Sequence, residues 1–339
     1  MPTYVIVVLS HLVAVVLTVA GLLIFGGPGA LTPMTGVADQ FKGVDYSDLP
    51  PVASVVARDG TPLAYRRYDG NDDGAAFAGA AILVHGSSAD SKSLHVLAKT
   101  IAARGFKVYA LDIRGHGATG PRGNIAYVGQ LDDDLEDFVA GIHEPRPKTL
   151  VGFSSGGGFA LRIAGGRLAS LFDRYLLIAP FISHDAPTSR PRSGGWVSVG
   201  LPRLIVLTIL NRFGFHWMNS LPVIRFAVSD AGRGRLTETY SYNLMTNFRA
   251  LPDYRQNIAA VHRPLHVIAG ENDEFVLPGR YASVFAEAQG LVTVALLPNV
   301  GHIAMTVDRH ATQATADLLS KASKSQTIAD QRNTVSATN

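Results

Sequence analysis

The chain has 339 residues, 47% of them hydrophobic, so it is long enough for one large α/β domain with an insertion and apolar enough for a sizeable core. It contains no cysteine, which excludes disulfides, thiolate metal sites and a cysteine nucleophile. The net charge of +3 is too small to indicate a nucleic-acid partner, and we expect none.

The N-terminal segment 4–27 is 24 residues long and carries no Asp, Glu, Lys or Arg. As a helix it would be roughly 36 Å long, enough to cross a bilayer. A cleaved signal peptide is the alternative, but the apolar run exceeds the usual ~7–15-residue core and no basic residue precedes it. We therefore predict a single-pass membrane anchor within residues 1–30. Its orientation stays open, because the first Lys or Arg, Lys42, lies well beyond the span.

A linker rich in Gly, Pro and Asp follows at 31–50, and a hairpin that turns at Asp59-Gly60 is predicted at 52–68. Short apolar runs then alternate with stretches of helical period. We predict strands at 79–86, 106–117, 148–154, 174–181, 263–270 and 292–298. We predict helices at 91–105, 127–143, 155–168, 279–289 and 309–322. This alternation indicates a parallel sheet with helices on both faces, an α/β core built from 51–181 and 263–322. The polar tail, 323–339, is predicted to be disordered.

The alternation stops between 182 and 262, which predicts an inserted, mainly helical cap over the end of the sheet. Its clearest element is an apolar helix at 200–215, with Pro202 in the first turn. Residues 181–263 hold ten Arg, no Lys and four Asp or Glu, a net charge of +6. An apolar, basic cap favours acyl chains with anionic head groups or a lid on an anionic membrane. A solvated basic face on an ordinary lid is the alternative.

The most informative stretch is 150–166, a glycine-rich turn between a predicted strand and a predicted helix. Such turns cradle phosphates or hold a catalytic serine. The P-loop pattern fails because Gly158 stands where a Lys is needed, and the dinucleotide pattern fails because Leu161 replaces its third Gly. Residues 152–156 instead match G-x-S-x-G at a strand-to-helix turn, which predicts that Ser154 is a nucleophile.

A serine hydroxyl needs a base to take its proton, and the expected chain order is Ser, acid, His. His302 follows the last predicted strand, so we predict that it is the base. His85 and His116 precede the serine and are in the wrong order. Asp273 follows strand 263–270 and is the predicted acid that orients the imidazole. Three other carboxylates compete for that role: Asp185, Glu271 and Glu274. The first of these follows strand 174–181 and is the strongest alternative.

Acyl transfer also needs donors for the negative charge on the carbonyl oxygen. We predict that the backbone N–H groups of Ser155, directly after the nucleophile, and of Ser87, in the loop after strand 79–86, form this oxyanion hole. The alternative for the second loop is an ordinary polar turn.

Together these motifs resemble the α/β-hydrolase fold family over about 52–320, where LVHGSS, YALDIRGHGATG, VGFSSGGG, IAGENDEFV and NVGHIAM occur in that family's order. The chain is most similar to the monoacylglycerol lipase, lysophospholipase and serine-aminopeptidase-like group, for which the motif at 112–117, D-x-R-G-H-G, is typical. The resemblance implies that this motif shapes a loop near the site, and it implies no metal and no organic cofactor. Ser155 is a departure, because many members carry Met or a larger residue there.

The sequence therefore predicts a membrane-anchored serine hydrolase of carboxylic esters, above all lipid-like esters of the monoacylglycerol or lysophospholipid type. A serine aminopeptidase or amidase of the same fold is the first alternative, disfavoured by the few acids of the cap, and a non-catalytic binding protein is the second. A dehalogenase or an epoxide hydrolase is disfavoured, because these enzymes use an Asp as the nucleophile at the position of Ser154. The sequence does not determine the acyl-chain length or the oligomeric state.

Overall fold

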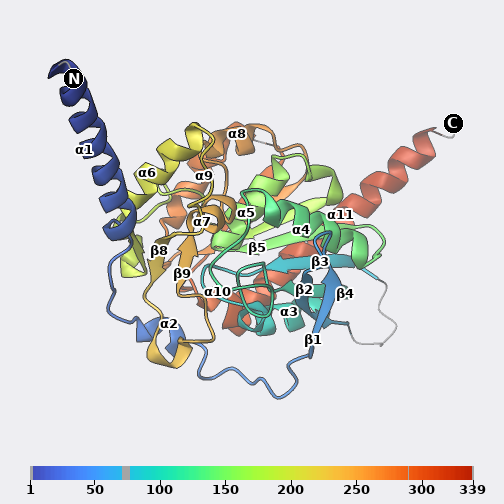
Figure 1. Cartoon of the computed structure of the whole chain (residues 1–339). Helices are drawn as coiled ribbons and strands as arrows, with labels where there is room; N and C mark the ends of the chain where they lie inside the picture. The colour runs from blue at the N-terminus through green and yellow to red at the C-terminus, as the bar shows by residue number, and fades with distance from the viewer. Residues whose placement is uncertain (1–2, 71–76, 289, 338–339) are drawn as a thin grey trace.

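The computed structural model describes residues 3–70, 77–288 and 290–337, and an eight-stranded sheet lies at its centre (Figure 1). The spatial order is β1 (Val52–Val56), β2 (Pro62–Tyr68), β4 (Phe106–Leu111), β3 (Gly79–Val84), β5 (Lys148–Phe153), β6 (Arg174–Ile178), β10 (Leu265–Gly270) and β11 (Val292–Leu297). β2 pairs antiparallel with β1 and β4, and the other pairs are parallel. The predicted hairpin and the six predicted parallel strands are confirmed.

Helices cover both faces of this sheet. The core helices are α3 (His95–Ala102), α4 (Gln130–Gly141), α5 (Ser155–Ala164), α9 (Tyr281–Val284), α10 (Ala304–Val307) and α11 (Arg309–Ala337). The chain moves one way along the sheet from β3 to β4, and the other way from β4 to β5 and β6. Right-handed crossovers therefore place α3 on one face, where α11 packs against it, and α4 and α5 on the opposite face.

The direction of winding reverses at β3, so the loops after β3 and β5 meet in the middle of one sheet edge. All six residues of β3 are buried, as are five of the six in β5. Runs that are buried on both faces are typical of central parallel strands. Ligand sites in such sheets lie at the carboxyl ends of the strands, at this reversal point.

The cap between β6 and β10 contains helices and a second sheet. Its helices are α6 (Leu201–Arg212), α7 (Tyr242–Asn247) and α8 (Tyr254–Ala259). Its antiparallel strands are β7 (Val197–Val199), β8 (Pro222–Phe226) and β9 (Thr239–Ser241). The predicted helix at 200–215 is confirmed as α6. The small sheet differs from the expectation of a mainly helical cap, because strands of three to five residues leave almost no period in the sequence.

Two further helices lie at the ends of the chain. α1 (Thr3–Phe25) is, among the described residues, the one helix long and apolar enough to cross a membrane. It projects from the body beside α6 (Figure 1) and leads through α2 (Thr35–Asp39) to the core. At the other end, α11 continues to Ala337 through the segment predicted to be disordered. A helix that is already nucleated extends by one hydrogen bond per added residue, so polar composition alone does not end it.

Candidate active site

Ser154 lies at the turn from β5 into α5 with a φ of 54° and a ψ of −117°, a strained backbone conformation. A Cβ at Gly152 would lie 2.2 Å from the carbonyl oxygen of Gly156. A Cβ at Gly156 would lie 2.5 Å from the carbonyl oxygens of Val84 and His85. The glycines of the G-x-S-x-G motif are therefore steric requirements of this turn.

Two more glycines follow in the first turn of α5. A Cβ at Gly157 would lie 2.7 Å from Cβ of Pro180, and one at Gly158 would lie 2.2 Å from the carbonyl oxygen of Phe181. The carbonyl of Ser154 also accepts a hydrogen bond of 2.9 Å from the N–H of Phe181. These glycines let α5 pack tightly against the chain that leaves β6, and this packing holds the turn that carries Ser154 in place.

His302 and Asp273 form a buried pair beyond the ends of β11 and β10. His302 Nδ1 lies 2.6 Å from Asp273 Oδ2, and the other carboxylate oxygen accepts hydrogen bonds of 2.8 Å from the N–H groups of Phe275 and Val276. Because the carboxylate is held in this way, Nδ1 of His302 carries the proton and Nε2 is left to accept one. The rings of Phe153 and Phe275 flank the imidazole, with centroids 4.8 Å and 5.1 Å away.

The competing carboxylates have other contacts. Asp185 accepts a hydrogen bond from the hydroxyl of Ser183. Glu274 accepts one of 2.8 Å from the backbone N–H of His302, and Glu271 is exposed. Of the four acids considered, Asp273 is the one whose carboxylate contacts the imidazole of His302.

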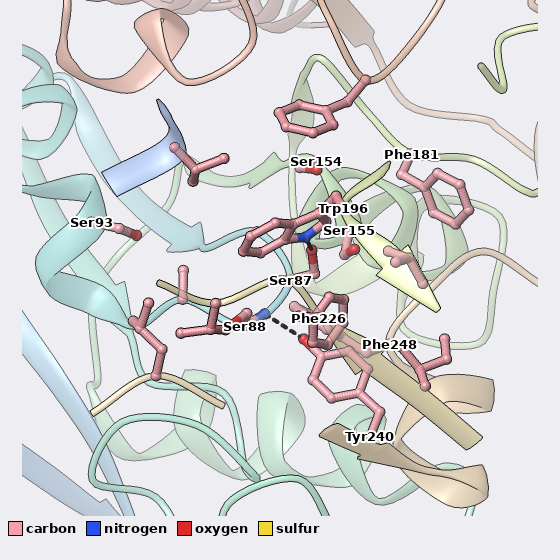
Figure 2. A pocket seen from close by; sticks show the side chains of 18 of the residues that line it. Ser87, Ser88, Ser93, Ser154, Ser155, Phe181, Trp196, Phe226, Tyr240 and Phe248 are labelled. Carbon is pink, nitrogen blue, oxygen red and sulfur yellow. Dashed lines mark hydrogen bonds between the residues drawn. The ribbon is translucent and has the colours of Figure 1, made fainter. Parts of the chain in front are cut away.

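The nucleophile, the base and the two predicted oxyanion donors line the same cavity: Ser154, His302, Ser87 and Ser155. No hydrogen bond joins the side chains of Ser154 and His302 among the described residues, and catalytic hydrogen bonds are often long without substrate. The backbone N–H groups of Ser87 and Ser155 likewise have no partner within the described chain, so both are free to donate to a ligand. The hydroxyl of Ser87 accepts a 3.2 Å hydrogen bond from the indole of Trp196 in the cap (Figure 2).

A second cap residue, Tyr240 of β9, supports the Ser87 loop and was missed by the sequence analysis. Its hydroxyl accepts a 2.8 Å hydrogen bond from the N–H of Ser88 (Figure 2) and lies 2.6 Å from Nε2 of His116. Burial lowers the pKa of His116 well below its ordinary value and raises that of Tyr240. The imidazole is therefore neutral, and its Nε2 accepts a hydrogen bond from the hydroxyl of Tyr240. Ser88 and Tyr240 are 152 residues apart, so no local pattern could have indicated the contact.

The D-x-R-G-H-G loop is an internal scaffold. The carboxylate of Asp112 accepts hydrogen bonds from the N–H groups of Ser91 and Ala118, at 2.7 Å and 2.9 Å. Arg114 is buried and pairs with Asp134 at 2.6 Å. These contacts hold the D-x-R-G-H-G loop beside the loop that contains Ser87. They also occupy the side chains of Asp112 and Arg114.

The cavity has a volume of about 740 Å³, and its wall is largely apolar. The core contributes Phe153, Phe181 and the four site residues, and the cap contributes aromatic and aliphatic side chains: Trp196, Leu201, Leu204, Ile224, Phe226, Tyr240 and Phe248. The linker supplies a third wall: Met34, Val37, Ala38 and Phe41. Among the residues that the structure describes, no three His, Asp or Glu side chains converge in a way that could hold a metal ion.

A family model described as serine aminopeptidase, S33, matches residues 76–308, well over half of the chain. The chain belongs to this family. A monoacylglycerol lipase of Mycolicibacterium smegmatis is 32% identical to this S33 chain over 114 residues. That match covers 32% of the chain and 40% of the relative, so the chain spans less than half of the relative's length.

Solved structures share the fold over much more of the S33 chain. A soluble variant of monoglyceride lipase from Saccharomyces cerevisiae superimposes with a TM-score of 0.61 at 16% identity, over 82% of this chain and 96% of that one. A membrane phospholipase A superimposes with a TM-score of 0.53 at 18% identity, over 93% of this chain and 98% of that one. The S33 chain is therefore a hydrolase of the α/β-hydrolase fold.

Proposed function

We propose that the protein is a membrane-anchored serine hydrolase that cleaves lipid-like carboxylic esters of the monoacylglycerol or lysophospholipid type through an acyl-enzyme. The observation that carries this proposal is the convergence of the strained Ser154 with the His302–Asp273 pair at one apolar cavity. The similarity to a monoacylglycerol lipase supports the same substrate class.

In the proposed mechanism, Oγ of Ser154 attacks the acyl carbon while Nε2 of His302 takes its proton, and Asp273 stabilises the resulting imidazolium. The carbonyl oxygen becomes an oxyanion that the N–H groups of Ser87 and Ser155 bind. The N-terminus of α5 adds favourable electrostatic potential at this point. His302 then donates the proton to the leaving alcohol. A water, activated by the same imidazole, attacks the acyl-enzyme and releases the carboxylic acid.

The membrane part of the proposal rests on α1 and α6. The guanidinium of Arg203 on α6 donates hydrogen bonds of 2.8 Å to the carbonyls of Leu23 and Ile24, at the end of α1. α6 exposes an apolar row, and the chain after it exposes three aromatic side chains: Leu201, Ile205, Ile209, Phe213, Phe215 and Trp217. Apolar surface beside a membrane span suits contact with the bilayer, where the substrates of such an enzyme are dissolved.

An aminopeptidase of the same family would need a carboxylate to hold the substrate ammonium. Asp90 is the one acidic side chain at the cavity wall within the described residues, and it already pairs with Arg235 at 3.0 Å. This arrangement favours esters over peptides with a free amino terminus.

The test combines labelling by a fluorophosphonate with turnover of p-nitrophenyl esters of graded chain length. We expect Ser154→Ala to abolish labelling and to lower kcat by a factor on the order of 10⁴ or more. Ser155→Ala is the matched control, because its backbone N–H is retained, and it should label like the wild type. Labelling or ester turnover that survives Ser154→Ala would refute the nucleophile. Turnover of aminoacyl amides without turnover of esters would select the peptidase.

A further inference from the structure

Four cationic side chains line the cavity that holds Ser154: Lys42, Lys92, Arg235 and Arg249. The first pairs with Asp39 at 2.6 Å, the second lies 4.2 Å from the ring centroid of Tyr46, and the third pairs with Asp90. Arg249 has no ion pair and no side-chain hydrogen bond to any residue that the structure describes. Of the four, it is therefore the one whose side chain has no partner of any kind among the described residues, which leaves it available to a ligand.

Arg249 is fixed close to the nucleophile by its backbone. It lies between α7 and α8, and the N atom of the next residue, Ala250, lies 3.3 Å from the position that a Cβ at Gly158 would take. Gly158 belongs to the first turn of α5, the helix that begins directly after Ser154. The segment that carries Arg249 thus packs against the helix whose N-terminus faces the reacting carbonyl.

The guanidinium is only partly exposed, and its Nε is buried without a partner. Burial lowers the pKa of Arg249, while the nearby Tyr242 and Asp185 raise it and Arg162 lowers it. No ion pair joins Asp185 to Arg249 among the described residues, and the carboxylate of Asp185 accepts a hydrogen bond from the hydroxyl of Ser183. A partly buried cation without an anion destabilises the empty site, and a bound anion would offset that cost.

We propose that Arg249 binds an anionic group of the substrate, a phosphate or a carboxylate placed close to the scissile ester. Guanidinium binds either oxyanion through two parallel hydrogen bonds. The proposal rests on the proposed ester hydrolysis and narrows its substrate class to anionic lipid-like esters. A neutral monoacylglycerol would fill the apolar wall but leave the guanidinium unpaired, so it would be the poorer substrate.

The experiment compares three esters of glycerol-like alcohols that share one acyl chain: a neutral monoacylglycerol, a monoacylglycerol phosphate and a monoacylglycerate. The full-length protein is assayed as the wild type, Arg249→Met and Arg249→Lys. Arg255→Met is the matched control, because this exposed arginine on α8 contacts the ring of Tyr254 and does not line the cavity.

We expect the wild type to prefer an anionic ester by about 10- to 100-fold in kcat/KM. Arg249→Met should remove this preference while keeping turnover of the neutral ester, Arg249→Lys should retain part of it, and the control should retain all of it. The better of the two anionic esters identifies phosphate or carboxylate. Equal loss on all three esters, or no anionic preference in the wild type, would overturn the proposal.

A binding measurement separates this inference from the hydrolysis itself. Dodecyl phosphate and dodecanoate should raise the Tm of the wild type more than neutral monododecyl glycerol does, and Arg249→Met should abolish the difference. If the wild type hydrolyses no ester but shows this Arg249-dependent shift, ester hydrolysis fails and the anion site stands. Ester hydrolysis without the shift contradicts the anion site alone. If Arg249→Met does not fold, the Tm shifts of the wild type and of Arg249→Lys with the same three ligands still decide whether the anion site exists.

Discussion

The edge of the central sheet and the cap face each other across one cavity, but their functional residues are held in different ways. Ser154, Asp273 and His302 follow β5, β10 and β11, and one hydrogen-bonded ladder places the ends of these strands at the same edge. Within the described residues, no strand of the cap pairs with a strand of the core sheet. Separate long-range hydrogen bonds of backbone and side-chain groups hold the cap instead, such as those that Asn243 donates to the carbonyls of Ile125 and Ala126.

In the enzyme that we propose, the sheet edge and the cap therefore have different roles. The sheet edge supplies the reacting groups, which any ester needs, and the cap and the linker supply the surfaces that distinguish one ester from another. Substitutions at the edge should therefore change kcat for all esters alike. Substitutions in the cap should change the choice of ester or its delivery from the membrane.

The largest effect is expected at the sheet edge. Asp273→Asn should lower kcat by about 10⁴-fold for every ester, because the amide favours the wrong tautomer of His302. Asp185→Asn, which removes the competing acid, should leave kcat within a few-fold of the wild type. Steady-state kinetics of both variants decide between the acids, and a reversed pattern would make Asp185 the catalytic acid.

An intermediate effect is expected where the cap contacts the oxyanion loop. Tyr240→Phe leaves the N–H of Ser88 and Nε2 of His116 without their partner, so the free energy of unfolding should fall by about 1–3 kcal/mol. We expect kcat to fall by roughly tenfold for every ester, because the loop of Ser87 loses its support.

Urea unfolding and steady-state kinetics measure both changes. Tyr254→Phe is the control, since the hydroxyl of this buried tyrosine has no hydrogen bond among the described residues. If Tyr240→Phe and Tyr254→Phe have the same kcat and the same free energy of unfolding, the cap does not support the reacting groups. The sheet edge would then hold them without help from the cap.

The smallest effect is expected at the joint between α1 and α6. Arg203→Met removes the hydrogen bonds to Leu23 and Ile24 and one of 2.6 Å to Pro222. Turnover of an ester dissolved in vesicles should fall by roughly three- to tenfold, which corresponds to about 1 kcal/mol, while turnover of a short, water-soluble ester should not change.

Arg212→Met, at an exposed position on the same helix, serves as the reference. Equal losses on both kinds of ester would mean that Arg203 supports the cap fold rather than the position of the cap at the membrane.

The sequence predicted the sheet and the meeting of the candidate catalytic residues at one edge of it, because both depend on local patterns and on strand order. Gly152 and Gly156 are sterically required around Ser154, and Asp273 and His302 each follow a strand of a parallel sheet, whose carboxyl ends must meet. The placement of Ser154 therefore followed from its glycine motif, and that of Asp273 and His302 from their positions after strands.

The contacts of the cap could not be predicted from the sequence, because they join residues that are far apart along the chain. Arg203 caps carbonyls 179 and 180 residues away. Of the ten arginines of the region, Arg249 is the one that lines the cavity without a side-chain partner among the described residues, and only the tertiary structure shows this. The strands of the small sheet are too short for a period, and the helix beyond residue 322 continues one that tertiary packing had already nucleated.

The linker between α1 and β1 joins the proposed membrane anchor to the α/β core and also lines the cavity, through Met34, Val37 and Phe41. The N–H of Met34 donates a 2.8 Å hydrogen bond to the carbonyl of Ala227 in the cap, so this segment is docked. A protease that released the catalytic domain by cutting near residue 50 would also remove one side of the chamber and admit water to the acyl chain. The length of the linker and the choice of substrate therefore cannot change independently. A catalytic domain released by proteolysis would have a different selectivity among esters.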